Sequence, residues 1–187
     1  DSVRALKIDG VSPTSENINN GSYKIARPFY IATKGDVSEV TQDFMAFIMS
    51  KEGQEIVATS YIAVEDNAGL YAGSKPSGKI VVAGSTSVTP VMEELREAYL
   101  EINPNAEIEI HSTGSSAGMQ AAINGTADIG MASRELKDSE KAELDYLAIA
   151  IDGIAIINNP ANTIDDISLE NLTKIFIGEI TKWSDIK

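Results

Sequence analysis

Two successive strand–turn–helix units, both within residues 79–134, constrain the fold of this chain most strongly. Each unit has a short apolar or alternating run, a turn of small hydroxyl residues and then apolar residues at helical spacing. In chain order the segments are strand Lys79–Ala83, turn 84–87, a helix from Val88, strand Ala106–Ile110, turn Ser112–Ser116 and helix Ala117–Ile123. We expect both turns to face the same way. The pattern therefore predicts an α/β fold with a mostly parallel sheet and two helix N-termini directed at one place.

The two turns are a candidate site for a small oxyanion. A helix N-terminus presents unpaired backbone N–H groups and a partial positive charge, so two converging N-termini favour an anion. Hydroxyl groups would add neutral donors, and they come from Ser85, Thr86, Ser87, Ser115 and Ser116. The alternative is that these residues are ordinary helix caps. Spacing alone leaves both interpretations open.

Several motifs resemble the phosphate-binding proteins of the periplasmic-binding-protein superfamily, which are the receptors of phosphate ABC importers. The motifs are AGSTSV (83–88), TGSSAGM (113–119), GTADIGMASRELKDSE (125–140), DGIAIINNP (152–160) and IFIGEITKW (175–183). The resemblance implies that phosphate contacts Thr86, Ser87, Ser115, Ser133 and Arg134. Several members carry an aspartate, which accepts a phosphate proton, at the position matched to Ser133. This chain departs from that pattern.

The resemblance also implies the architecture, partners and location of the parent protein. It predicts a three-layer binding-protein lobe together with remnants of a second lobe. The expected partners are inorganic phosphate and the membrane subunits of the importer. The expected location is extracellular, periplasmic or at the cell surface, with a lipid anchor in the parent.

The order of the motifs is rearranged relative to that family. Residues 1–57 resemble the end of a receptor, and residues 78–187 resemble its beginning. The predicted divisions are 1–23 (second lobe), 24–57 (first lobe), 58–77 (linker), 78–160 (first lobe) and 161–187 (start of the second lobe). Most of the second lobe is missing, including the Gly/Ser/Thr turn after an arginine that completes the family's phosphate site. We therefore expect half a site.

Two explanations fit this order. A fragment cut across the junction of a tandem receptor is preferred, because residues 58–77 are mixed sequence and not a Gly/Ser linker. A circular permutant is the alternative. The linker allows closure within one chain or onto a neighbour, which would give a domain-swapped homodimer. An assembly module without ligand and a receptor for another oxyanion such as sulfate also stay open.

The remaining segments give further expectations. Val37–Val57 is predicted as one helix in which Gly53 is a blemish. The charges of the helix Asp138–Leu144 are predicted to be solvated. Four further strands are expected, Ser2–Ile8, Arg27–Thr33, Tyr146–Ile151 and Gly153–Asn158, and the last two are expected to be buried in the sheet. A helical segment is expected within Ser12–Asn20. A helix is expected over Ser168–Phe176, with Leu169, Leu172, Ile175 and Phe176 facing the core.

Composition excludes several classes of function. Fifteen basic residues against 28 acidic ones, a net charge of −13, exclude a nucleic-acid binder, which needs clustered Lys and Arg. The chain has no cysteine and one histidine, so no metal and no cofactor are expected. His111 precedes the second turn and invites a Ser-His-Asp triad, but GSSAG lacks the nucleophile-elbow spacing. Asp128 and Asp152 are expected to orient loops. The prediction is a binding protein and not an enzyme.

Overall fold

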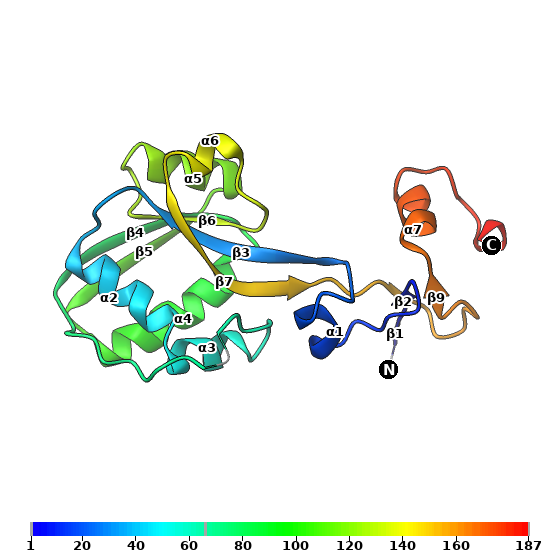
Figure 1. Cartoon of the computed structure of the whole chain (residues 1–187), viewed down its shortest axis with the longest axis horizontal. Helices are drawn as coiled ribbons and strands as arrows, with labels where there is room; N and C mark the ends of the chain where they lie inside the picture. The colour runs from blue at the N-terminus through cyan, green and yellow to red at the C-terminus, as the bar shows by residue number, and fades with distance from the viewer. Residues whose placement is uncertain (1, 66, 187) are drawn as a thin grey trace. The chain divides into compact units, whose positions relative to one another are not determined.

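The computed structural model describes residues 2–65 and 67–186 and divides the chain into two compact units (Figure 1). Unit 2 is Arg27–Asp152. Unit 1 comprises the described residues up to Ala26 and from Gly153 onward. The sequence places the changes of lobe after residues 23 and 160, and the structure divides the chain after residues 26 and 152.

Unit 2 is built on a five-stranded sheet. In spatial order the strands are β5 (Ala106–Ser112), β4 (Gly78–Gly84), β6 (Ile129–Ala132), β3 (Ala26–Thr33) and β7 (Asp145–Gly153). Strand β4 runs parallel to both β5 and β6, whereas β3 is antiparallel to β6. The predicted α/β class with a mostly parallel sheet is confirmed. Strand β3 is the predicted strand from the first part of the chain, and it lies inside the sheet.

Helices cover both faces of this sheet (Figure 1). Helices α2 (Glu39–Ile48), α3 (Lys51–Val57) and α4 (Thr89–Ile102) lie on one face, and α5 (Ser115–Ile123) and α6 (Asp138–Lys141) lie on the other. The larger core forms on the first face, where Phe44, Phe47, Leu95 and Tyr99 are fully buried. The result is the predicted three-layer lobe.

The single helix predicted over Val37–Val57 is wrong, because the chain breaks into α2 and α3 at Ser50. The hydroxyl of Ser50 donates to the carbonyl oxygen of Phe47 at 2.7 Å and accepts from the N–H of Gly53 at 3.2 Å. It thus ends one helix and caps the next. Gly53 is no blemish, since a Cβ there would lie 2.2 Å from the carbonyl oxygen of Phe47.

The described residues of the linker, 58–65 and 67–77, pack along unit 2. Ile62 forms an antiparallel bridge with Ile151 of β7, with N···O distances of 3.0 and 2.9 Å. The N–H of Tyr71 donates to Glu52 at 2.8 Å, and the carbonyl oxygen of Pro76 accepts from Asn103 at 2.9 Å. In this structure the described part of the linker therefore lies against the helices of unit 2.

A buried carboxylate anchors the linker most strongly. Asp43 on α2, 8% exposed, accepts hydrogen bonds from the hydroxyls of Tyr71 and Tyr99, the latter at 2.8 Å, and from the N–H of Ser74 at 3.0 Å. The ring of Tyr71 also packs edge-on against Phe47, with centroids 5.4 Å apart. Burial and the bond to Asp43 raise the pKa of Tyr71. The network joins α2, α4 and the linker.

Unit 1 contains two small sheets and short helices. Its elements are β1 (Arg4–Ala5), β2 (Lys7–Ile8), α1 (Ser15–Asn19), β8 (Ile157–Asn158), β9 (Asp166–Ile167), α7 (Leu169–Phe176) and the 3₁₀ helix η1 (Trp183–Asp185). Strand β1 pairs antiparallel with β8, and β2 pairs in parallel with β9. The strand predicted over Ser2–Ile8 is therefore split. The strand predicted over Gly153–Asn158 is reduced to β8 and lies outside the five-stranded sheet.

Helix α7 begins as predicted, since the hydroxyl of Ser168 accepts from the N–H of Asn171 at 3.1 Å. Its predicted inward face is wrong in part. Leu172 is buried, but Leu169 is 40% and Phe176 77% exposed. The sequence periodicity identifies an apolar face, but within unit 1 the described residues do not cover it.

Candidate functional site

The three predicted binding segments follow three adjacent strands. Gly84, the last residue of β4, is paired with Ser112 of β5 and with Met131 of β6. Because all three strands are parallel, the turns after them begin at one edge of the sheet, where open α/β sheets bind ligands. The sequence thus predicts the convergence of these turns correctly.

Hydrogen bonds link the three turns to one another. The hydroxyl of Ser85 donates to Ser133 Oγ at 2.9 Å, and the N–H of Ser133 donates to Ser115 Oγ at 3.2 Å. Arg134 Nη2 donates to Ser116 Oγ at 3.2 Å. Residues 48 and 18 positions apart in the sequence therefore share one polar cluster.

Helices α4 and α5 begin without a side-chain cap. Val88 and Gly114 occupy their N-cap positions, and neither receives a side-chain capping bond. In contrast, α1, α2, α3 and α7 are each capped by a hydroxyl, from Thr14, Ser38, Ser50 and Ser168. No hydroxyl therefore caps these two helices from the N-cap position. At α5 the amides of the first turn stay available to a ligand, whereas at α4 the N–H groups of Val88 and Thr89 bond the carbonyl oxygen of Ser85 at 3.1 Å.

Two glycines let α5 lie directly on β4. A Cβ on Gly118 would lie 2.3 Å from the Cα of Gly84, and a Cβ on Gly84 would lie 2.2 Å from the carbonyl oxygen of Met131. Gly84 also has φ of 146°, which disfavours a side chain. The N-terminus of α5 is thus held against the end of the central strand.

The candidate residues differ in exposure. Ser85 is 2% exposed, and its hydroxyl also accepts from the N–H of Ser87 at 3.2 Å. Thr86 and Ser116 are exposed, and the others lie between these extremes. Ser85 consequently holds the turn in place from its buried side, whereas Thr86 and Ser116 are exposed to solvent.

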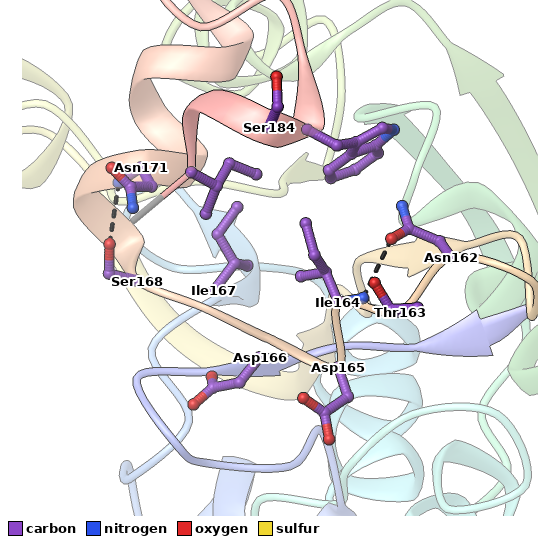
Figure 2. Close-up of a pocket in the computed structure, with 11 residues that line it drawn as sticks. Asn162, Thr163, Ile164, Asp165, Asp166, Ile167, Ser168, Asn171 and Ser184 are labelled. Carbon is purple, nitrogen blue, oxygen red and sulfur yellow. Dashed lines mark hydrogen bonds between the residues drawn. The ribbon is translucent and has the colours of Figure 1, made fainter.

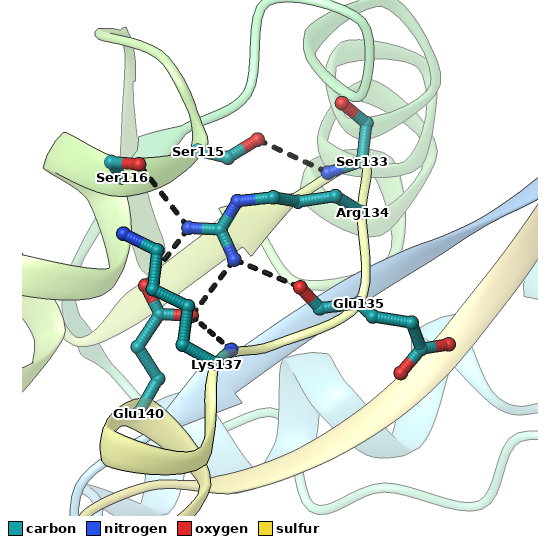
Figure 3. A network of polar contacts seen from close by, with 7 residues as sticks. All are labelled: Ser115, Ser116, Ser133, Arg134, Glu135, Lys137 and Glu140. Atoms are coloured by element: carbon teal, nitrogen blue, oxygen red, sulfur yellow. Dashed lines mark hydrogen bonds and ion pairs between the residues drawn. The ribbon is translucent and has the colours of Figure 1, made fainter.

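One member of the cluster, Glu140, was missed in the sequence, which predicted a solvated helix face. Glu140 is 6% exposed, and its carboxylate accepts from both Nη atoms of Arg134 at 2.8 Å and from the N–H of Lys137 at 2.8 Å (Figure 3). The bonds from Arg134 lower the pKa of Glu140, and the bond to Glu140 raises the pKa of Arg134. The one feature of the sequence that could have indicated this pair is that Glu140 follows Arg134 by six positions within the motif of residues 125–140.

The other titratable candidates lie apart from this cluster. His111 is exposed and lies 3.8 Å from Glu109 of its own strand, and among the described residues it makes no bond to Ser115 or Ser116. Asp128 accepts from the N–H of Val81 at 2.7 Å, and Asp152 pairs with Arg27 at 2.9 Å. Both carboxylates thus have structural partners, and the geometry offers no catalytic triad.

A cavity of about 510 Å³ lies in unit 1 and is separate from the predicted residues (Figure 2). Ile164 and Ile167 point to one side of the chain there, and Asp165 and Asp166 point to the other. Across residues 2–65 and 67–186, no group of three or more His, Asp or Glu residues is placed to hold a metal ion. The helices of the same residues are also too short or too polar to cross a bilayer.

A protein-family model and a curated relative both match this chain. Residues 70–187 match the model of the PBP superfamily domain. Phosphate-binding protein PstS 2 of Streptococcus agalactiae is 48% identical over 187 residues, which are 99% of this chain and 64% of that protein. The chain therefore spans about two thirds of the length of this relative.

Two solved structures are also similar. A phosphate ABC transporter, phosphate-binding protein, from Streptococcus pneumoniae matches with a TM-score of 0.94 and 44% identity, over 99% of this chain and 72% of that one. A putative phosphate ABC transporter substrate-binding protein with bound phosphate, from Clostridium perfringens, has a TM-score of 0.53 and 44% identity. That match covers 58% of this chain and 45% of the other.

Proposed function

This chain belongs to the PBP superfamily, in the family of the streptococcal phosphate-binding proteins, and we propose that it binds inorganic phosphate as part of the receptor of a phosphate ABC importer. One observation carries the proposal. Helix α5 begins without a side-chain cap at the edge where β5, β4 and β6 end, and the hydroxyls of Ser85, Ser115, Ser116 and Ser133 lie in one hydrogen-bonded cluster there. The names of the relatives support phosphate as the anion.

The proposed site holds phosphate with short hydrogen bonds from mostly neutral donors. Thr86 and Ser87 act from the first turn, Ser115 and Ser116 from the second, and Ser133 with Arg134 from the third. Ser85, which is buried, acts through Ser133 and the turn it holds. A net charge of −13 does not prevent phosphate binding. The attraction between the anion and N–H groups at hydrogen-bonding distance is stronger than its repulsion by distant carboxylates, which solvent ions screen.

Ser133 gives the proposed site a different chemistry from an aspartate at that position. A hydroxyl both donates and accepts, so it can pair with a protonated or an unprotonated phosphate oxygen. A carboxylate would reject an oxyanion that has no proton. We therefore expect weaker discrimination against sulfate than in receptors with aspartate there.

The proposed site is half of a receptor site. The chain spans 64% of its streptococcal relative, and no arginine followed by a Gly-Ser-Gly-Thr turn occurs in its sequence. In the complete receptor, a second lobe would close over the anion by a hinge motion. We further propose that the parent is a binding protein without enzymatic activity, located outside the membrane, lipid-anchored and docking on importer subunits.

We propose that the rearranged order belongs to one permuted receptor and not to a tandem junction. The pneumococcal match spans 99% of 187 residues, about 185, and these are 72% of a chain that is therefore about 257 residues long. The clostridial match spans 58% of 187, about 108, which are 45% of about 241. A chain of about 257 residues cannot contain two receptors of about 241.

Titration with phosphate, followed by ¹⁵N NMR and calorimetry after bound anion is removed, tests the function. We expect a dissociation constant in the roughly millimolar range, about −4 kcal/mol, because half the site is present. The amides of Ser115 and Ser116 should shift, whereas the capped amides of Thr41 and Asn171 provide internal controls. Shifts at the capped amides alone, or no shift at all, would exclude the proposed site.

Light scattering on the same sample tests the closure of the linker. Closure in cis predicts a monomer, since the linker contacts α2, α3 and α4 of its own chain. A stable dimer that dissociates only on unfolding would favour domain swapping.

A further inference from the structure

Arg134 has fewer free donors than its position in the cluster suggests. A guanidinium carries five N–H groups, four on its Nη atoms and one on Nε. Nη1 donates to the carbonyl oxygen of Glu135 at 2.9 Å and to Glu140 at 2.8 Å. Nη2 donates to Glu140 at 2.8 Å and to Ser116 Oγ at 3.2 Å. All four Nη hydrogens are thus engaged, and Nε is the N–H without a partner among the residues that the structure describes.

Glu140 occupies the edge of Arg134 that an oxyanion would otherwise take. Carboxylate and phosphate bind the two Nη atoms of arginine in the same bidentate geometry. Figure 3 shows the guanidinium extended from the Ser133 turn toward Ser116, with its Nη atoms directed at Glu140. The carboxylate is 6% exposed and is held in place by the N–H of Lys137. The carboxylate of Glu140 therefore neutralises Arg134, the cation that donates to Ser116 of the second turn.

We propose that Glu140 is the residue that sets the charge of this oxyanion site. It compensates Arg134 and leaves Nε as the single guanidinium donor for the ligand, so that neutral hydroxyl and amide groups dominate recognition. The inference rests on the proposed function. It predicts that phosphate affinity of the natural chain depends little on ionic strength, because the site carries almost no net charge.

The substitution Glu140→Gln tests this. The glutamine keeps the shape of the side chain but carries one acceptor oxygen, so at least one Nη hydrogen is released and Arg134 becomes an uncompensated cation. We expect about tenfold tighter phosphate binding at about 20 mM salt, and most of the gain should disappear at about 200 mM. The affinity of the variant for sulfate should increase by at least the same factor.

Glu143→Gln is the matched control. It removes the same formal charge in the same segment, but Glu143 is exposed and pairs with Lys34 at 3.4 Å. We expect its phosphate affinity to stay within about twofold of the natural chain at either salt concentration.

The outcomes separate the inference from the proposed function. Absence of phosphate-induced shifts at Ser115 and Ser116 in the natural chain would refute the function itself. If the natural chain binds but Glu140→Gln binds equally or more weakly, with an unchanged salt dependence, Glu140 does not set the charge of the site.

A second measurement covers the case that Glu140→Gln does not fold. In the natural chain, phosphate should shift the Nε–H resonance of Arg134, assigned by its loss in Arg134→Lys, and leave the Nη resonances in place. A shift of the Nη resonances without one at Nε would overturn the inference.

Discussion

Removing one hydroxyl from the linker should destabilise the whole of unit 2. The substitution Tyr71→Phe keeps the ring packed against Phe47 but removes a hydrogen bond to the buried carboxylate of Asp43. A hydrogen bond to a charged group contributes about 1.5–3 kcal/mol to the free energy of unfolding. Asp43 keeps two donors, Tyr99 and the N–H of Ser74, so the loss is confined to one bond.

The expected change in melting temperature follows from the size of the unit. Arg27–Asp152 comprises 126 residues. At about 2.1 cal/mol/K for each residue, its unfolding entropy near the midpoint is about 0.26 kcal/mol/K. A loss of about 1.5–3 kcal/mol therefore lowers the midpoint by about 6–11 °C.

Thermal unfolding followed by circular dichroism, with urea unfolding for the free energy, measures this change. Tyr146→Phe is the control, because Tyr146 is 41% exposed and its hydroxyl has no hydrogen-bond partner among the described residues. Should Tyr71→Phe melt within about 1 °C of the control, the linker would not be anchored through Asp43, and its role in closing the unit would be refuted.

Three other changes have defined outcomes. Gly118→Ala forces a methyl group against the backbone of Gly84, so we expect a loss of about 1–3 kcal/mol in urea unfolding together with weaker phosphate-induced shifts; wild-type stability would disprove the close approach. Ser50→Ala removes the cap of α3 and should cost about 1 kcal/mol, measured in the same way, whereas no loss would mean that the cap is dispensable. Burial raises the pKa of Tyr99 from 10.0 to about 12, which favours its protonated form in the folded state. Stability should hold below about pH 10 and fall between about pH 10 and 12, and Tyr99→Phe should remove the part of that fall that Tyr99 contributes, while Tyr30 and Tyr71, whose pKa values are also raised, still contribute theirs.

The sequence predicts most of the candidate site because each of its parts is local. A hydroxyl turn between a strand and a helix is visible in a few residues, and parallel strands bring such turns to one edge. The starts of α5 and α7 were predicted to within two residues or better. Ser133 and Arg134 came from the resemblance and lie in the cluster that the turns form.

Features that depend on tertiary contacts could not be predicted. Glu140 lies in a charged segment typical of a solvated face, and only the position of Arg134 explains its burial. Ser50 resembles an ordinary helix residue until its hydroxyl is seen to bond Phe47 and Gly53. The exposed Phe176 has an apolar periodicity that gives no information about which segment would cover it.

The internal position of β3 has a consequence for synthesis of the chain. Strand β3 lies between β6 and β7, and Tyr30 pairs with Ala132, 102 residues later. Translation proceeds from the N-terminus, so β3 leaves the ribosome long before either neighbouring strand exists. Its apolar residues Phe29 and Ile31, fully buried in the folded unit, must stay unpaired during that interval. Of the five strands of this sheet, β3 is made first and gains its second neighbour only when β7, the last of them, has been made, so chaperone binding during translation should concentrate there.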